Sequence, residues 1–441
     1  MQPIDILIEH ATILTMDEHL TIIEDGSIGI RGDRIASIGP TSPPEQRTSA
    51  AKVIDAHGGI VMPGLINGHT HAAMTLFRGL ADDLPLMDWL NRYIFPVEAN
   101  MDPEFVYSGT LLGCAEMILS GTTTFCDMYL FEQETARAAA GAGIRALVGE
   151  VLYDFPSPNY GSIENGFRYT QRLIDTWKGH PLISVAVEPH ALYTCSPDLL
   201  KEANAIALHN GVPLILHVAE TLSELETIRE RYGKKPFEHM EALGICGDHV
   251  IADHCAHLDM EEMERIRCHG IRVVTNPESN MKLVAGNGLI PELIEQGVVV
   301  GLGTDGAASN NDLDLFSEMN TLAKIHKVSR MDPSVMDAVT VLRCATSEGA
   351  RALGMADSIG SLEVGKKADV IVVDTDRPHL TPIYNPYSHL VYCASGSDVI
   401  HSIIDGRLVM KNRNLLTLDL AEVMDAAERQ AKRVRQWVGM G

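Results

Sequence analysis

The sequence has little positive charge, few cysteines and no long apolar run. Its 441 residues include 59 acidic side chains against 35 lysines and arginines, which gives a formal net charge of −24. A chain this acidic repels nucleic acid and anionic lipid, so we expect neither as a partner. No apolar run approaches the roughly 18 residues that a bilayer span needs. We therefore expect no membrane segment.

The eight cysteines are scattered and form no Cys-x-x-Cys pair. In a chain of this length they are typical of reduced, mostly buried thiols. The first residues also lack the basic segment of a secretory signal peptide. We therefore expect a cytoplasmic protein of ordinary globular composition, in which 45% of the residues are hydrophobic.

From residue 61 onward, short apolar runs alternate with stretches of helical periodicity. Eight runs within roughly 250 residues match a parallel (β/α)₈ barrel of the TIM type. Near-continuous apolar strands are also what a sheet buried on both faces requires. The predicted strands are Val61–Asn67, Thr122–Met128, Ala146–Leu152, Ile183–Glu188, Pro213–Val218, His249–His254, Ile271–Thr275 and Val298–Gly303. The helical stretches include Pro197–Asn210, Leu222–Leu243 and Met260–His269.

Both ends of the chain are rich in short strand-like segments. They are Asp5–Ile13, Gly26–Arg31, Arg34–Ile38 and Val53–Asp55 at one end, and Asp369–Val373, Leu390–Tyr392, Val399–Ile404 and Arg407–Met410 at the other. A final amphipathic helix covers about Leu420–Trp437. Neither end has enough strands to bury a core. We therefore predict that residues 1–60 and 363–441 form one small β-sandwich domain beside a catalytic barrel of residues 61–362.

The segment from Pro63 to His71 ends in two histidines, His69 and His71, one residue apart. Residues i and i+2 of a strand face the same side, so both imidazoles can reach one ion. An exposed His-Thr-His is more often a solvated turn than a metal site. The pair therefore needs support from the rest of the chain.

Histidines or carboxylates stand at the end of nearly every predicted barrel strand. Catalytic residues of such barrels lie at the carboxyl ends of the strands. Packing explains any one of these residues, but it does not explain the whole series. The series is His69 and His71 after strand one, Glu188 and His190 after four, His217 and Glu220 after five, His254 after six, Asn276 to Asn280 after seven and Asp305 after eight.

The residue types in this series suit hydrolysis assisted by a metal ion. Three neutral imidazoles and one carboxylate favour a borderline ion such as Zn²⁺ and leave one position for water, whose pKa the ion lowers to about 7. Asp305 can ligate the ion and accept the water proton, and Glu220 can donate a proton to the substrate. His254 can hold the attacking hydroxide and stabilise the charge that develops.

Taken together, these motifs resemble the amidohydrolase superfamily. The matching residues are the segment from Pro63 to His71, His217 with Glu220, His254, Thr304 with Asp305, and the run from Gly360 to Asp369. More narrowly, the run from His71 to Leu86 and the following Asp88-Trp89-Leu90 resemble the methylthioadenosine/S-adenosylhomocysteine deaminases and their chlorohydrolase relatives. The resemblance covers essentially the whole chain.

The resemblance implies a ligand set for the metal. The ligands would be His69, His71, His217 and Asp305. The binuclear branch of the family has a carboxylated lysine where this chain has Glu188-Pro189-His190. This departure implies a single divalent ion in each subunit, with Zn²⁺ expected and Fe²⁺ or Mn²⁺ as alternatives.

The resemblance also implies the substrate contacts. Glu220 would meet N1 of a purine, His190 another ring nitrogen, and Asp305 the departing amine. Glu98 would bind the ribose hydroxyls, because a carboxylate can accept from two neighbouring hydroxyls, and Trp89 would lie against the ligand. The alternatives are that Trp89 belongs to the core and that Glu98 is a solvated helix residue.

We therefore expect hydrolytic deamination of an adenine nucleoside. Relatives that accept S-adenosylhomocysteine resemble one another in having an arginine after strand three, but residues 154–167 contain none and Arg168 is the first. This departure favours 5′-methylthioadenosine, which would yield 5′-methylthioinosine and ammonia. S-adenosylhomocysteine and adenosine remain alternatives, as do a triazine-type chlorohydrolase, a guanine deaminase and a metal-binding relative without activity. The expected partners are the nucleoside and further copies of the chain in a homo-oligomer.

Overall fold

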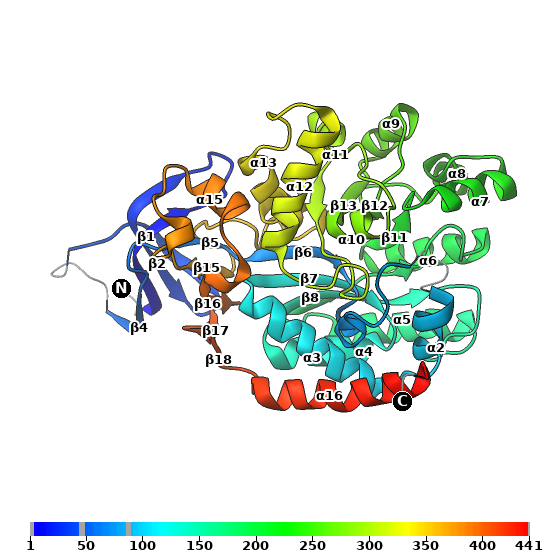
Figure 1. Cartoon of the computed structure of the whole chain (residues 1–441), viewed down its shortest axis with the longest axis horizontal. Coiled ribbons are helices and arrows are strands. Elements are labelled where there is room, and N and C mark those ends of the chain that lie inside the picture. The colour runs from blue at the N-terminus through cyan, green and yellow to red at the C-terminus, as the bar shows by residue number, and fades with distance from the viewer. Residues whose placement is uncertain (1–3, 44–48, 85–89, 440–441) are drawn as a thin grey trace.

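The protein consists of a barrel and a smaller β domain that lie side by side (Figure 1). The structure is a computed structural model and describes residues 4–43, 49–84 and 90–439. In the view of Figure 1 the β domain is on the left, and helix α16 (Leu420–Trp437) runs along the lower edge beside α3 (Pro103–Leu119). None of the helices in these ranges combines the length and apolarity that a bilayer span requires.

Strands from both chain ends form one nine-stranded sheet. Its order is β18-β17-β16-β15-β5-β1-β2-β3, with β4 paired to β1. The two ends meet where β15 pairs with β5 in antiparallel fashion, which places Val370 opposite Pro63. The strands are β1 (Ile4–Leu14), β2 (Ile22–Arg31), β3 (Arg34–Pro40), β4 (Ala50–Asp55), β5 (Ile60–Pro63), β15 (Val370–Val373), β16 (Val399–Ile404), β17 (Arg407–Lys411) and β18 (Asn414–Leu415).

The strand predicted at Leu390–Tyr392 is wrong, because this segment ends helix α15 (Pro386–Tyr392). Asn385 caps the helix by accepting a hydrogen bond from the Ser388 N–H at 3.2 Å. Pro386 then occupies the first turn, where a missing N–H costs nothing. A three-residue apolar run cannot by itself distinguish a strand from a buried helix turn.

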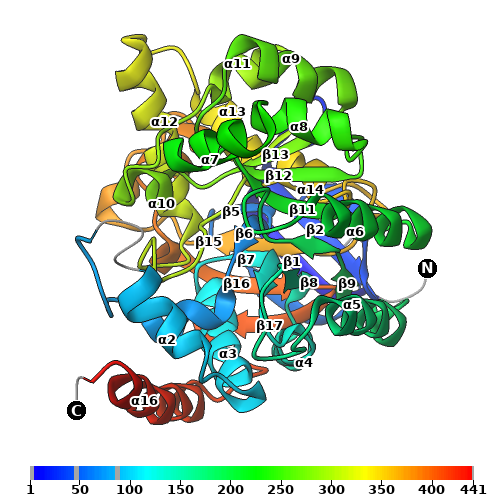
Figure 2. The same cartoon turned by 90° about the vertical axis from the view of Figure 1, so that its right-hand side faces the viewer.

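The predicted eight-stranded parallel barrel is confirmed, and Figure 2 looks toward the strand ends with the helices around them. Bridges from Val187 to Leu214 and from Ala191 to His217 join its two sheets on one side. On the other side, the Asp305 N–H donates to the His69 carbonyl at 3.0 Å. The strands are β6 (Leu65–Thr70), β7 (Thr122–Tyr129), β8 (Arg145–Leu152), β9 (Ile183–Val185) with β10 (Glu188–Pro189), β11 (Leu214–Val218), β12 (Val250–His254), β13 (Arg272–Thr275) and β14 (Val300–Leu302).

The first predicted barrel strand divides at Gly64. Residues before it form β5 in the β domain, and residues after it form β6 in the barrel. A Cβ at Gly64 would lie 2.1 Å from the Thr123 side chain on β7, so only glycine lets the chain step between the sheets at this point. The division of the chain into residues 1–60 with 363–441 and residues 61–362 stays a prediction.

Most barrel helices begin and end at recognisable capping residues. Ser196 caps α6 (Pro197–Asn210), and Gly211 ends it in the left-handed conformation at φ 66°. The predicted stretch 222–243 divides into α7 (Leu222–Tyr232) and α8 (Pro236–Leu243). The other helices are α2 (Phe95–Glu98), α4 (Glu132–Ala142), α5 (Ile163–Trp177), α9 (Met260–His269), α10 (Pro277–Lys282), α11 (Ile290–Glu295), α12 (Leu315–Arg330), α13 (Ala338–Cys344) and α14 (Ser347–Ala352), with short turns at Ala72–Phe77, Leu90–Ile94, Pro378–Leu380 and Gly396–Asp398.

Candidate active site

Two histidines at the barrel mouth are oriented by backbone carbonyls. The Nδ1–H of His217 donates to the His190 carbonyl at 2.8 Å, and the Nδ1–H of His71 donates to the Met128 carbonyl. When such a ring is neutral, its Nε2 is unprotonated, which is the form that binds a metal. Both rings can therefore turn a ligand nitrogen toward the site.

His69 is completely buried beside these two rings, with ring centroids 4.9 Å from each. Its Nδ1 lies 2.9 Å from a carboxylate oxygen of Asp253. Both of its ring nitrogens are buried, and neither makes a hydrogen bond to a described residue. Buried polar atoms almost always find a partner, so an orphaned imidazole nitrogen among other imidazoles indicates a site for an ion.

Asp305 supplies the carboxylate of this cluster. One of its oxygens accepts hydrogen bonds from the Ser279 hydroxyl at 2.6 Å and the Ser309 hydroxyl at 2.9 Å. The other lies 3.2 Å from His71 Nε2. Burial alone would raise the pKa of Asp305, but the facing imidazoles outweigh it and hold that pKa well below its usual range. Burial likewise opposes protonation of His71, whereas Asp305 raises the pKa of His71 to about 9.

The cluster has the composition of a metal site. Ligand atoms of His69, His71 and His217 lie within 4.8 Å of one another, and so do those of His69, His254 and Asp305. Three imidazole nitrogens and one carboxylate oxygen suit Zn²⁺ in a catalytic site. The structure thus brings the four predicted ligands together, and the orphaned nitrogen of His69 shows that they fit such an ion.

Left-handed backbone turns three of the strand ends toward the cluster. Ala219, His254 and Asp305 have φ values of 53°, 69° and 62°. Residues other than glycine in this conformation carry strain, which is commonly found at functional sites. The resulting position of His254 is fixed by Asn280, whose side-chain oxygen lies 2.9 Å from its Nδ1. Its ring is 5.3 Å from that of His217.

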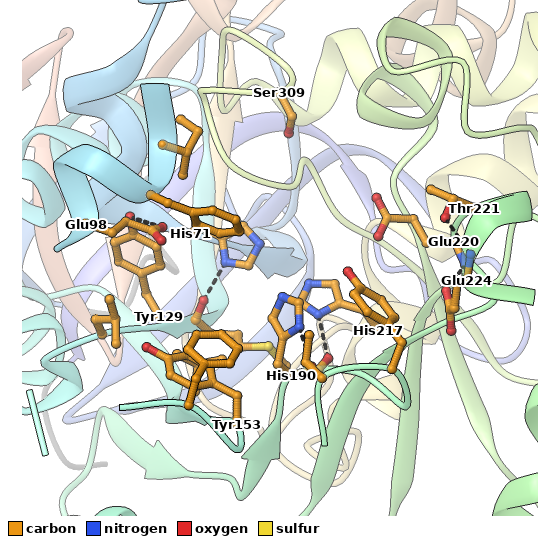
Figure 3. Close-up of a pocket in the computed structure, with 18 of the residues that line it drawn as sticks. His71, Glu98, Tyr129, Tyr153, His190, His217, Glu220, Thr221, Glu224 and Ser309 are labelled. Atoms are coloured by element: carbon orange, nitrogen blue, oxygen red, sulfur yellow. Dashed lines mark hydrogen bonds between the residues drawn. The ribbon is translucent and has the colours of Figure 1, made fainter. Parts of the chain in front are cut away.

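A cavity of about 810 Å³ opens from the cluster. Its lining includes the predicted residues His71, Glu98, His190, His217, Glu220, His254 and Asp305. In the view of Figure 3, Glu98 and Glu220 lie on opposite sides of the labelled histidines. The cavity therefore offers one carboxylate at each side, with the labelled histidines between them. Trp89, the remaining predicted contact, lies outside the described residues.

Glu220 is held in place by Glu224, a residue that the sequence analysis did not single out. The carboxylate of Glu224 accepts the N–H groups of Ala219 at 3.0 Å and Glu220 at 2.9 Å. Burial raises the pKa of Glu224 to about 7. The pattern Thr221-x-x-Glu224 at the start of α7 is that of a capping box, and this pattern could have drawn attention to Glu224 in the sequence.

Glu98 ends α2 and faces the cavity half-buried. It accepts a hydrogen bond from the Tyr129 hydroxyl at 2.9 Å. Burial raises the pKa of Glu98, and the bond from Tyr129 partly offsets this rise. Glu98 is therefore not a solvated helix residue. Tyr129 was missed, although its place at the end of β7 could have drawn attention to it.

Glu188 lies on β10 and His190 directly follows this strand, and the two side chains have different surroundings. The Nδ1 of His190 lies 2.9 Å from the Thr194 hydroxyl, and burial lowers the pKa of His190 to about 4, so the ring is neutral. Both carboxyl oxygens of Glu188 are buried without a hydrogen-bond partner among the described residues. Burial raises the pKa of Glu188 well above its usual value, which favours its neutral form, and Glu188 lies outside the ligand cluster.

The barrel and the histidine–aspartate cluster at its mouth define the class of hydrolases that work with a metal in a (β/α)₈ barrel. Residues 60–409 match the model of the amidohydrolase family. The chain belongs to the amidohydrolase family.

Relatives across the whole length are named as deaminases. The chain is 56% identical to a 5-methylthioadenosine/S-adenosylhomocysteine deaminase of Syntrophobacter fumaroxidans, over 98% of each chain. It is 44% identical to a 5′-deoxyadenosine deaminase of Methanosarcina mazei, over 97% of this chain and 98% of that one. The crystal structure of an adenosine deaminase from Xanthomonas campestris with bound zinc matches with a TM-score of 0.96 and 39% identity, over 98% of this chain and 99% of that one.

Proposed function

We propose that this protein hydrolytically deaminates an adenine nucleoside modified at its 5′ position, with 5′-methylthioadenosine as the first substrate. One observation carries this proposal: Glu220, His190 and Glu98 line a single cavity with the histidine–aspartate cluster. These groups match the N1 edge, a second ring nitrogen and the ribose diol of such a nucleoside. The deaminase relatives support the same reaction.

A divalent ion would be held by His69, His71, His217 and Asp305. When bound, such an ion lowers the pKa of a coordinated water to about 7 and so supplies a nucleophile at neutral pH. We take the ion to be a single Zn²⁺, because the donor set suits zinc and the matching adenosine deaminase structure contains it. Fe²⁺ and Mn²⁺ are the alternatives.

The side chains of the cavity would move the protons of the reaction. Addition of water to C6 needs a proton on N1 and a base for the water proton; Glu220 would provide the first and Asp305 the second. His254 would hold the incoming oxygen and stabilise the developing charge. The C6–N bond then breaks, and the departing amine would take the proton from Asp305 and leave as ammonia. As the C6 carbonyl forms, the C6 hydroxyl would return its proton to Glu220, which restores both side chains.

The remaining contacts would select the nucleoside. His190, whose Nδ1 lies 2.9 Å from the Thr194 hydroxyl, would bind N3 of the purine through its other ring nitrogen. Glu98 would accept from the two ribose hydroxyls. Phe155 stacks on Tyr153 with centroids 3.9 Å apart, and with Pro156 it gives the cavity an apolar wall that suits a thiomethyl group.

The test is ammonia release by the zinc-loaded protein from methylthioadenosine, adenosine and S-adenosylhomocysteine, with Glu220→Gln as the variant. We expect turnover of methylthioadenosine by the parent. In the variant kcat falls by about 10²- to 10⁴-fold, because proton transfer is lost, while the zinc content stays the same.

The matched control is Glu226→Gln, an exposed position on α7, the helix that follows Glu220, which should keep the parent kcat. Near-normal turnover by Glu220→Gln would overturn the role of Glu220. Ammonia from guanine, or chloride from a chlorotriazine, without ammonia from any adenine nucleoside would overturn the proposed reaction.

We also propose a cytoplasmic location and a homo-oligomer. The cysteines support the first proposal, since all eight are free thiols and five are buried. Sedimentation of the purified protein tests the second.

A further inference from the structure

One cation faces the cavity that holds the candidate active site. Among the described residues that line it, Arg231 is the single lysine or arginine. Arg231 lies near the C-terminal end of α7, and Ser223 and Thr227 of the same helix line the cavity too. Each of these three residues is four positions from the next, so they share one face of the helix. The cavity therefore has a polar wall on α7 that ends in a guanidinium.

Most hydrogen-bonding capacity of Arg231 is unused. One of its N–H groups donates to the Tyr193 carbonyl at 2.7 Å. No other hydrogen bond and no ion pair of the Arg231 side chain occurs among the described residues. A guanidinium has five N–H donors in a planar fork, which matches both oxygens of a carboxylate.

The position of Arg231 fits the 5′ end of the proposed substrate. The carbonyl of Tyr193 binds Arg231, and the ring of Tyr193 lies 6.0 Å from that of His190. His190 is the proposed partner of N3, and N3 and N9 of a purine are both bonded to C4. The ribose on N9 therefore begins beside His190, and a long substituent on its 5′ carbon can extend over Tyr193 toward Arg231.

We propose that Arg231 is a specificity-determining residue that binds a carboxylate at the end of the 5′ substituent. The cavity then takes adenine nucleosides whose 5′ thioether ends in an amino acid, such as S-adenosylhomocysteine, as well as methylthioadenosine. This assignment rests on the deaminase function proposed above. The carboxylate needs no arginine in residues 154–167, because α7 provides one in the lining of the same cavity.

The test compares substrates in the parent and in Arg231→Gln. The measured quantity is the ratio of kcat/KM for S-adenosylhomocysteine to kcat/KM for methylthioadenosine. We expect the ratio to fall by about 10- to 100-fold, since a hydrogen-bonded charge pair is lost with one substrate only. A rise in KM for S-adenosylhomocysteine should account for most of the fall.

Three controls separate this role from a structural one. Arg229→Gln removes the same charge from an exposed position on α7 outside the cavity lining and should leave the ratio unchanged. Arg231→Lys keeps the charge but loses the planar fork, so its ratio should lie between those of the parent and Arg231→Gln. A thioether analogue of S-adenosylhomocysteine without its carboxylate should be deaminated equally well by the parent and by Arg231→Gln.

The outcomes distinguish the two proposals. Absence of ammonia release from every adenine nucleoside by the parent overturns the proposed function. Turnover of methylthioadenosine with no turnover of S-adenosylhomocysteine overturns the role of Arg231 alone. An unchanged ratio in Arg231→Gln, or an equal fall in Arg229→Gln, overturns it as well.

Discussion

At the scale of single residues, the orientation of His69 depends on a carboxylate that binds no substrate. Asp253 is completely buried on β12, and its carboxylate lies 2.9 Å from His69 Nδ1. A carboxylate behind a metal-binding imidazole fixes the tautomer and raises the basicity of the ligand nitrogen. Asp253 is therefore a positioning residue for the candidate metal site.

Replacing Asp253 with Asn should weaken zinc binding by about 10- to 100-fold, the usual effect of losing such a partner. Competition with a fluorescent chelator measures the dissociation constant directly. Asp248→Asn, an exposed site just before the same strand, is the control and should bind zinc as the parent does. Equal affinities for Asp253→Asn and the parent would contradict this role.

The candidate ligands could be predicted from the sequence, whereas the residues that support them could not. His69, His217 and Asp305 were recognisable because a parallel barrel brings its strand ends together. Asp253 and Tyr129 carry no motif, since their importance depends on which neighbour they touch. A contact across the barrel cannot be deduced from spacing along the chain.

At the scale of elements, a buried carboxyl connects β8 to the segments beside it. Glu150 is completely buried near the end of β8. It accepts the Glu132 N–H at the start of α4 at 2.9 Å and the Asn159 side-chain amide at 2.7 Å. Burial raises the pKa of Glu150 from 4.5 to about 7. Its protonated form is thus favoured in the folded protein.

This pKa gives stability a defined pH dependence. Between pH 4.5 and about 7 the unfolded chain releases the Glu150 proton while the folded protein retains it. The contribution of Glu150 is therefore fully present below pH 4.5 and is lost as the pH rises through 7, by about 3 kcal/mol in total. As the pH rises through this window, the free energy of unfolding of Glu150→Gln should fall less than that of the parent protein.

Urea denaturation of parent and variant at about pH 5 and about pH 8 measures the difference in slope. The other buried carboxyls are the same in both proteins, so their contributions to the pH dependence cancel in this comparison. Identical pH slopes in the two proteins would show that Glu150 is ionised in the folded state.

Predictions for elements succeeded where local signals agreed with tertiary packing. Ser196 and Gly211 mark the two ends of α6 in the sequence, and the helix begins and ends beside them in the structure. The run at Leu390–Tyr392 became the end of α15, because the Asn385 cap decided its conformation. The apolar run from residue 61 divides at Gly64, because the residues before it belong to the sheet of the β domain and the residues after it belong to the barrel.

At the scale of the whole molecule, a buried ion pair joins the barrel to the β domain. Arg145 at the start of β8 contacts the Asp369 carboxylate at 2.9 and 3.1 Å, and a carboxylate oxygen of Asp405 at 3.3 Å. Arg145 and Asp369 are both more than nine-tenths buried. Breaking such a pair leaves a buried charge without its partner.

Arg145→Met should therefore lower the free energy of unfolding by about 3–5 kcal/mol. Arg137→Met removes an arginine from an exposed pair with Glu134 and should cost less than about 1 kcal/mol. Denaturant titration of the two variants gives the comparison. Equal losses in both would contradict a linking role for Arg145.

The sequence by itself determined the barrel, the metal-binding residue types and the deaminase family, because strand periodicity and strand-end residues are local properties. Only the tertiary structure decided which side chains support the ligands and which cation faces the cavity. Asp253, Glu224 and Arg231 acquire their roles from contacts between segments that are distant in the chain. Such contacts follow from the packing of the whole barrel and leave no pattern in any one segment.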